Sequence, residues 1–359
     1  MIITNYDIGL YNFRRELLEK LLQEGHVVTI LLPDGEKVKD MQIMGCIFEE
    51  LEINRRGKNI IQDFKLFVGI VRKLMRIKPD IVLTYTVKPN IYGGMAARLL
   101  HIPYIANITG LGSALENSGL LQKITLRMYR TALKRAVCVF CQNKENLKFI
   151  KNRKVTRAKV RLLPGSGVNL RQYSLMEYPP DTGLKFVFVS RVMEEKGINE
   201  YIEAAKVIKQ KYSDTQFHIC GFCEEEFVER LEKLQREGII EYHGMVRDIR
   251  QVLKDVHCVV LPSYHEGMSN ALLEAAATGR PLIASDIPGC RECFKDREGG
   301  LLIKPKDAID LERKIEEFIE IPYDEKKKMG LAARSLVEQH FNRDEVVDTY
   351  MKEIRGGRA

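Results

Sequence analysis

Short apolar segments of strand length alternate with amphipathic segments of helix length along most of this chain of 359 residues. Alternation of this kind indicates parallel β-sheets whose crossover helices cover both faces, the doubly wound α/β arrangement. The pattern occurs twice, first up to Lys151 and again from Leu184 to Ile303. The predicted strands of the first series are Met1–Thr4, Val27–Leu32, Cys46–Leu51, Ile81–Tyr85, Tyr104–Ile108 and Ala136–Cys141.

The two series are separated by Leu163–Asn169, a stretch that contains one proline and two glycines. Such residues interrupt regular structure, so this stretch is the predicted interdomain linker. A chain of this length is expected to form about two domains, each with its own core. We therefore predict two Rossmann-like, doubly wound parallel-sheet domains, residues 1–165 and 166–340.

The stretch from Leu261 to Glu292 holds the most informative local pattern. A strand ending at Leu261 is followed by a polar loop with Glu266, a helix over 271–278 that carries Glu274, and a second strand. Ligands of parallel sheets bind outside the carboxyl ends of the strands, which is where this loop should lie. Free amides and a partial positive charge at the helix N-terminus suit a diphosphate. The two glutamates could then bind the hydroxyls of a sugar and of a ribose.

A simpler interpretation of Glu274 is a surface charge or a helix-capping partner. A capping box would need serine or threonine three residues earlier, and that residue is Ala271. The surface-charge alternative stays open, because charged residues on helices are mostly solvated.

Two cations follow the predicted strand Leu184–Val189. Arg191 and Lys196 stand just beyond its carboxyl end, where they could neutralise the diphosphate of a leaving group. The alternative is that both are solvated and paired with the neighbouring Glu194 and Glu195.

These residues also carry a resemblance to a known family. The spacing of Glu266 and Glu274, the run Gly279-Arg280-Pro281 that closes the helix, and Ser190-Arg191 followed by Lys196-Gly197 resemble the family 4 retaining glycosyltransferases of the GT-B fold. That fold has two Rossmann-like domains with an interdomain cleft, and a C-terminal helix, here 343–357, that packs back on the first domain.

The resemblance implies roles for residues of the second domain. Arg191 and Lys196 would contact the donor phosphates, Glu266 would hold the donor sugar and Glu274 the ribose. Backbone groups would line the rest of the donor site, which implies donor contacts from Gly267, Met268, Ser269, Asn270, Gly244, Met245 and, in the first domain, Gly9.

Residues of the first domain are implied on the acceptor side. Asn12 and Arg14 lie near the junction of the first strand and helix, and Lys88 and Asn90 follow the strand Ile81–Tyr85. An ordinary polar loop is the alternative for the latter two. Thr109 stands where many relatives have a histidine before a glycine, so no general base is inferred there.

Charge is distributed unevenly along the chain. Residues 1–170 contain 28 Lys and Arg against 14 Asp and Glu, whereas the remainder contains 29 against 35. A basic first domain favours an anionic partner such as a membrane surface, although a solvated basic face is the alternative. No zinc finger or aromatic RNA-binding signature is present, so nucleic acid is not expected. The basic residues gather in two regions, one of Lys123, Arg127, Arg130 and Lys134 and one of Arg55, Arg56, Lys58, Lys65, Arg72, Lys73, Arg76 and Lys78.

The segments TYTVKPNIYGG and NITGLGSALE are similar to those of family members that extend undecaprenyl-diphosphate-linked sugars. The resemblance implies a UDP-sugar donor (UDP-GalNAc, UDP-GlcNAc, UDP-Gal or UDP-GalA), a lipid-linked saccharide acceptor and retention of configuration. A peripheral, cytoplasmic location at the inner face of the plasma membrane is expected, since no signal peptide or membrane span is visible. A UDP-sugar 2-epimerase and a non-catalytic, nucleotide-sugar-binding membrane scaffold are the alternatives.

No metal and no cofactor are expected. The sequence has no Asp-x-Asp motif, and positive side chains and a helix terminus could replace a cation. The eight cysteines include three CxxC spacings, but Cys138 and Cys141 fall in a predicted strand, where positions three apart point to opposite faces. We therefore predict reduced, mostly buried thiols.

Overall fold

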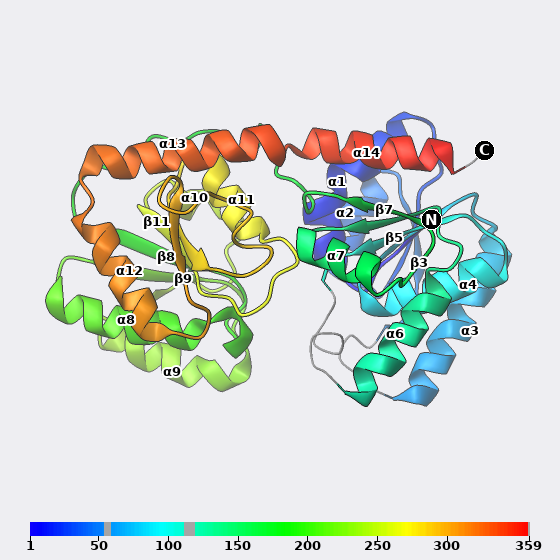
Figure 1. Cartoon of the computed structure of the whole chain (residues 1–359), viewed down its shortest axis with the longest axis horizontal. Coiled ribbons are helices and arrows are strands. Elements are labelled where there is room, and N and C mark those ends of the chain that lie inside the picture. The colour runs from blue at the N-terminus through cyan, green and yellow to red at the C-terminus, as the bar shows by residue number, and fades with distance from the viewer. Residues whose placement is uncertain (54–58, 111–118, 358–359) are drawn as a thin grey trace. The chain divides into compact units, whose positions relative to one another are not determined.

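The computed structural model describes residues 1–53, 59–110 and 119–357 and confirms the α/β fold class (Figure 1). The chain forms two compact units, one of Met1–Ser166 with Arg343–Ala359 and one of Gly167–Asn342. Each unit is built on one sheet whose strand pairs are all parallel. Three basic residues of the sequence prediction, Arg55, Arg56 and Lys58, and the segment after Gly110 lie outside the described residues.

The first unit has a sheet of seven strands in the order β3-β2-β1-β4-β5-β6-β7. This is the doubly wound order, in which the chain starts at the centre and builds outward in both directions. Separate apolar cores lie against its two faces, one around Ile3 and Val139 and the other around Ile2 and Phe140. The strands are β1 (Ile2–Ile3), β2 (Thr29–Leu32), β3 (Ile47–Glu50), β4 (Val82–Tyr85), β5 (Tyr104–Ile108), β6 (Cys138–Cys141) and β7 (Lys159–Leu162). The helices are α1 (Asp7–Gln23), α2 (Val38–Ile43), α3 (Ile60–Ile77), η1 (Pro89–Gly93), α4 (Gly94–Leu99), α6 (Leu120–Ala132) and α7 (Lys144–Asn152).

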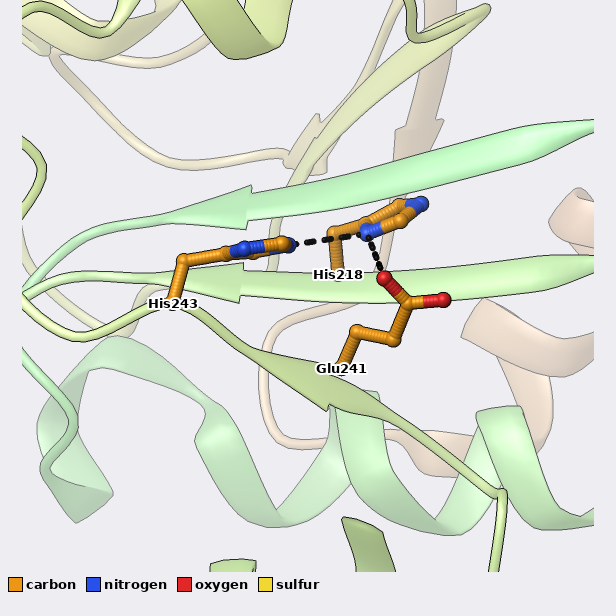
Figure 2. A group of neighbouring side chains, drawn as sticks. All are labelled: His218, Glu241 and His243. Atoms are coloured by element: carbon orange, nitrogen blue, oxygen red, sulfur yellow. Dashed lines mark hydrogen bonds and ion pairs between the residues drawn. The ribbon is translucent and has the colours of Figure 1, made fainter.

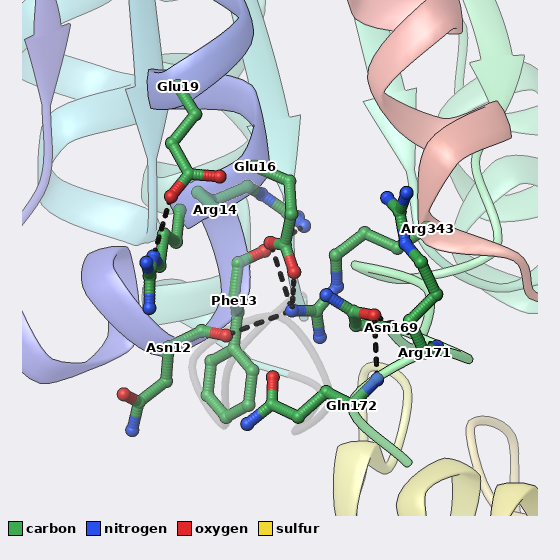
Figure 3. Close-up of polar contacts among 10 residues, drawn as sticks. Asn12, Phe13, Arg14, Glu16, Glu19, Asn169, Arg171, Gln172 and Arg343 are labelled. Carbon is green, nitrogen blue, oxygen red and sulfur yellow. Dashed lines mark hydrogen bonds and ion pairs between the residues drawn. The ribbon is translucent and has the colours of Figure 1, made fainter. Parts of the chain in front are cut away.

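The C-terminal helix α14 (Arg343–Gly356) packs against the first unit. Its Tyr350 is fully buried in the same core as Leu17 of α1, and the Tyr350 hydroxyl donates to the Asn107 side chain. At the start of the helix, the Arg343 guanidinium donates to the Glu16 carboxylate at 3.0 Å and to the Asn12 carbonyl at 3.1 Å (Figure 3). Apolar packing and a buried ion pair therefore both hold this helix against the first unit.

The second unit has a sheet of six strands in the order β10-β9-β8-β11-β12-β13, again doubly wound. The strands are β8 (Lys185–Val189), β9 (Gln216–Cys220), β10 (Glu241–Tyr242), β11 (Cys258–Leu261), β12 (Leu282–Ser285) and β13 (Gly300–Ile303). The helices are η2 (Glu194–Lys196), α8 (Ile198–Lys211), α9 (Glu225–Arg236), α10 (Arg250–Leu253), α11 (Asn270–Ala277), α12 (Ala308–Glu320) and α13 (Tyr323–His340). The central strands are apolar on both faces, as parallel strands covered by helices require.

All eight cysteines are free, and seven of them are buried. Cys138 packs in one core of the first sheet and Cys141 in the other, as the strand prediction required. Burial raises the pKa of both thiols to about 12. None of the described helices combines the length and the apolar character needed to cross a bilayer.

His257 is held in one neutral form next to β11. Its Nδ1 accepts the Lys185 amide at 3.1 Å, and its Nε2 lies 3.0 Å from the Pro180 carbonyl, to which it donates. A second proton would have to go on Nδ1, against an N–H donor. Burial also lowers the pKa of this imidazole. The folded protein therefore disfavours the protonated His257 ring, whereas the unfolded chain can carry a protonated histidine.

We expect the free energy of unfolding to fall as the pH drops below about 6.5, the unfolded pKa of histidine, at up to about 1.4 kcal/mol per pH unit. The unfolded chain binds the proton first, so acid favours unfolding. Urea titrations at several pH values should show a shallower dependence for His257→Asn, whose amide oxygen can still accept the Lys185 amide. His340→Asn, at an exposed position, is the control, and equal slopes for wild type and His257→Asn would contradict the assignment.

Candidate functional site

The candidate site lies at the carboxyl edge of the second sheet. The segments that follow β8, β9, β10 and β11 begin at this edge because the strands are parallel, and β8 lies between β9 and β11 in the sheet. Residues 190–197 and 262–269, which carry the predicted phosphate and sugar contacts, therefore follow neighbouring strands. The sequence prediction placed both at strand ends, and the topology makes them adjacent.

Glycines allow these loops to pack backbone against backbone. Gly197 has φ +76°, and a Cβ there would lie 2.0 Å from the Pro262 carbonyl oxygen. Gly289 has φ +87°, and a Cβ there would lie 2.8 Å from the carbonyl oxygens of Glu266 and Gly267. No other residue type fits either position without moving the loops. Gly289, which sequence reasoning did not single out, also accepts the Ser269 amide at 2.9 Å.

Lys196 and Glu266 form an ion pair across the two loops. Lys196 Nζ lies 2.6 Å from Glu266 Oε1, and the side chains are only 17% and 13% exposed. The alternative pairing of Lys196 with Glu194 or Glu195 is not observed, and both of those glutamates are exposed. The Glu195 carbonyl instead accepts the Tyr264 amide at 2.9 Å, which joins the loops beside the pair.

The ion pair gives the site a specific chemical capacity. Without a ligand, the Lys196 ammonium and the Glu266 carboxylate neutralise one another. A ligand that carries both an anion and hydroxyls could separate them and bind to each. A diphosphate would compete for the ammonium, and a hydroxyl could then donate to the carboxylate. Partial exclusion from water strengthens both interactions.

Helix α11 begins next to Glu266. Ser269 is its N-cap, and the Ser269 hydroxyl accepts the Leu272 amide at 3.3 Å. The third helical position is thus Leu272, so Glu274, at the fifth, is not part of a capping box. The half-buried Glu274 is on the same helix whose N-terminus should attract an anion.

Arg191 lies one residue beyond the junction of β8 and β9, where the Ser190 amide donates to the Cys220 carbonyl at 3.1 Å. Its side chain is exposed, and over the described ranges no carboxylate pairs with its guanidinium. The charge is therefore available at this edge of the sheet, but the structure does not join it to the Lys196–Glu266 pair.

The segment that contains the predicted donor contacts Gly244 and Met245 follows β10. The His243 amide donates to the Ile219 carbonyl at 2.9 Å, and the Gly244 carbonyl accepts the Gly221 amide at 2.8 Å. These bonds fix the backbone of the segment beside β9. Met245 is 57% exposed, so its side chain is not part of the core.

The helix α1 begins earlier than the sequence predicted. The sequence predicts this helix over about Tyr11–Glu24, whereas α1 begins at Asp7. Gly9 is therefore helical and not part of a loop, and Asn12 and Arg14 lie in the helix as predicted. The early start has a physical reason: an acidic residue in the first turn is favourable, and the Asp7 carboxylate accepts the Lys37 amide at 2.8 Å.

Arg14 and Asn90 serve the interior of the first unit. Arg14 is 6% exposed, and its guanidinium lies 5.3 Å from the ring centroid of Tyr85 and 5.6 Å from that of Tyr350. Asn90 is 1% exposed; its amide nitrogen donates to the Asn107 carbonyl at 2.8 Å. These contacts give both residues a structural role, and their contact with an acceptor stays a prediction.

The other acceptor-side residues are more accessible. Asn12 is exposed, and Thr109 is half-buried directly after β5. Lys88 Nζ lies 2.6 Å from Asp63 Oδ1, and the Tyr92 hydroxyl donates to the other oxygen of the same carboxylate at 3.0 Å. Lys88 is therefore positioned by α3 instead of being a solvated loop residue.

Two family descriptions match the chain: Glycosyl transferases group 1 over residues 177–336 and Glycosyl transferase 4-like over residues 9–143. The N,N'-diacetylbacillosaminyl-diphospho-undecaprenol alpha-1,3-N-acetylgalactosaminyltransferase of Campylobacter jejuni is 26% identical over 368 residues, covering 98% of this chain and 96% of the relative. The UDP-Gal:alpha-D-GlcNAc-diphosphoundecaprenol alpha-1,3-galactosyltransferase of Escherichia coli is 30% identical over 276 residues, covering 70% of this chain and 69% of the relative.

Solved structures show the same fold. HepE of Anabaena, in complex with UDP and glucose, superposes with a TM-score of 0.80 at 16% identity, covering 99% of this chain and 98% of that one. Sucrose-phosphate synthase of Thermosynechococcus elongatus gives a TM-score of 0.80 at 19% identity, with the same coverage. The matched families, the relatives and the two doubly wound units agree: the chain belongs to the family 4 glycosyltransferases of the GT-B fold and is a hexosyltransferase.

Proposed function

We propose that the protein transfers a hexosyl group from a UDP-sugar to a polyprenyl-diphosphate-linked saccharide during assembly of a bacterial surface polysaccharide or glycan. The names of the two relatives support this acceptor class, since both describe transfer to an undecaprenyl-diphosphate-linked sugar. The observation that carries the donor proposal is the Lys196–Glu266 pair beside the N-terminus of α11. This arrangement suits a ligand that combines a diphosphate with sugar hydroxyls.

The proposed reaction retains the anomeric configuration. The donor diphosphate draws Lys196 away from Glu266 and, with Arg191 and the amides of the α11 N-terminus, receives the charge that develops on the leaving group. Glu266 accepts hydrogen bonds from the donor sugar, and Glu274 from the ribose. The bond from C1 to the phosphate oxygen breaks as the acceptor hydroxyl forms its bond to C1 on the same face. The acceptor proton goes to the departing phosphate, and no metal ion is required.

Attachment to the inner face of the plasma membrane is part of the proposal. Three apolar residues near the start of α3 are strongly exposed, Ile60 by 84%, Ile61 by 67% and Phe64 by 65%. Apolar side chains beside cations suit the interface of an anionic bilayer, where each close Lys or Arg contributes about 1 kcal/mol. Exposed cations of α3 and α6 that would serve are Lys65, Arg72, Lys123, Arg127 and Arg130.

The proposal is tested by measuring UDP release from a panel of UDP-GalNAc, UDP-GlcNAc, UDP-Gal and UDP-GalA. Each donor is incubated with the full chain, with and without undecaprenyl-diphosphate-linked saccharides. We expect one donor to release UDP at least tenfold faster with acceptor, and the product linkage to be α by NMR. Acceptor-independent turnover of the donor sugar would instead indicate an epimerase. UDP binding without release under any condition would indicate a non-catalytic scaffold.

A further inference from the structure

Two histidines and a glutamate converge at the open edge of the second sheet (Figure 2). His218 lies on β9, and Glu241 lies directly opposite it on the edge strand β10. His243 follows Glu241 by two residues, so it leaves the strand on the same side. Parallel pairing thus brings together side chains that are far apart in the sequence.

The ligand-capable atoms of these residues face one another. His218 Nδ1 lies 3.0 Å from His243 Nε2 and 3.4 Å from Glu241 Oε2, and the three atoms all lie within 4.8 Å of one another. The two rings are nearly parallel, with centroids 5.2 Å apart. Figure 2 shows both the His243 ring and the Glu241 carboxylate directed at the same nitrogen of His218.

We propose that His218, Glu241 and His243 bind a divalent transition-metal ion of the zinc class. Two ligand atoms that are each about 2.1 Å from a tetrahedral ion lie roughly 3.4 Å apart. This is close to the 3.0 Å and 3.4 Å that separate His218 Nδ1 from the other two ligand atoms. Two imidazoles and one carboxylate favour Zn²⁺, Ni²⁺, Co²⁺ or Cu²⁺ over the oxygen-preferring Mg²⁺. The Glu241 side chain is 58% exposed, so its carboxylate can rotate to complete the site.

His218 presents Nδ1 to the cluster and keeps its other ring nitrogen in the interior. His218 Nε2 is buried without a hydrogen-bond partner among the described residues, so metal binding at Nδ1, which places the ring proton on Nε2, breaks no hydrogen bond of Nε2. The side chain is only 9% exposed, so the sheet holds the His218 ring in place while its Nδ1 faces Glu241 and His243.

The position of the site gives the ion a defined effect. It would link β9 to the edge strand β10 and hold His243, the residue before Gly244. The ion is structural in this proposal and takes no part in the transfer reaction, so metal binding is independent of the proposed function. Three protein ligands leave a fourth position for water.

The test is a titration of the tag-free full chain with Co²⁺, followed by its ligand-field absorption and by displacement with Zn²⁺. We expect saturation at one Co²⁺ per chain. The variants are His243→Ala and Glu241→Gln, both at exposed positions that should leave the fold intact, and each should weaken binding at least tenfold. His340→Ala removes an exposed imidazole elsewhere and should bind like wild type.

Three results would overturn the proposal. One is the absence of saturable Co²⁺ absorption, and another is equal binding by wild type and His243→Ala. The third is a thiolate charge-transfer band lost in Cys223→Ser, which would place the metal at the half-buried Cys223 instead.

Discussion

Replacing Lys196 or Glu266 with alanine should lower kcat at least about 100-fold, because each change removes a charged group from a site that is largely shielded from water. Lys196→Ala removes the cation proposed to stabilise the departing diphosphate. Glu266→Ala removes the acceptor proposed for the donor hydroxyls. The measurement is steady-state UDP release with saturating donor and lipid-linked acceptor, using the donor selected by the panel.

The size of the loss in kcat, and whether the losses of the two single variants multiply, distinguish a catalytic role of Lys196 and Glu266 from a purely structural one. The two residues contact one another at 2.6 Å, so the double variant should be much less impaired than the product of the single effects predicts. Glu194→Ala removes an exposed charge from the same loop and should keep activity within about twofold of wild type. Near-normal kcat for Lys196→Ala, in protein with an unchanged circular dichroism spectrum and melting temperature, would contradict the assigned role.

The sequence predicted the strands that are apolar throughout, and it did not predict an edge strand with charged residues. Strands such as β6 and β11 are continuous apolar runs, and their type follows from composition alone. The edge strand β7 reads Lys-Val-Arg-Leu, and its charged positions hide it. Lys159 and Arg161 of this strand pair with Glu353 of α14, nearly two hundred residues away, so the stabilising contact could not be seen locally.

Part of the candidate site could likewise be predicted from the sequence, and part could not. Arg191, Lys196 and Glu266 could be predicted because each lies in the segment that follows a strand, and the position of a strand end can be read locally. The Lys196–Glu266 partnership and the close approach of Gly289 depend on strand order. The clustering of His218 with Glu241 and His243 depends on the register between β9 and β10, which no periodicity specifies.

Arg280 was noted in the sequence as part of a motif, and the structure explains what its side chain does. It is fully buried, and its guanidinium donates to four carbonyl groups at the end of α11 and the segments beside it. The acceptors are Leu253 and Glu177 at 2.7 Å, Lys254 at 3.2 Å and Thr278 at 3.4 Å. Burial lowers the pKa of Arg280 to about 10, so it remains charged at neutral pH. One side chain thus satisfies carbonyls from three segments.

Arg280→Met should therefore lower the free energy of unfolding by about 3 kcal/mol or more, since each buried carbonyl left without a donor costs about 1–3 kcal/mol. Methionine fills much of the volume, so the loss reports the hydrogen bonds more than a cavity. Denaturant unfolding measures the change, and Arg247→Met, at an exposed position, should stay within about 0.5 kcal/mol of wild type. Because Arg280 lies in the interior, the folded variant should retain donor affinity well below its melting temperature. A stable Arg280→Met protein with weakened donor binding would reverse the assignment and make Arg280 a ligand-binding residue.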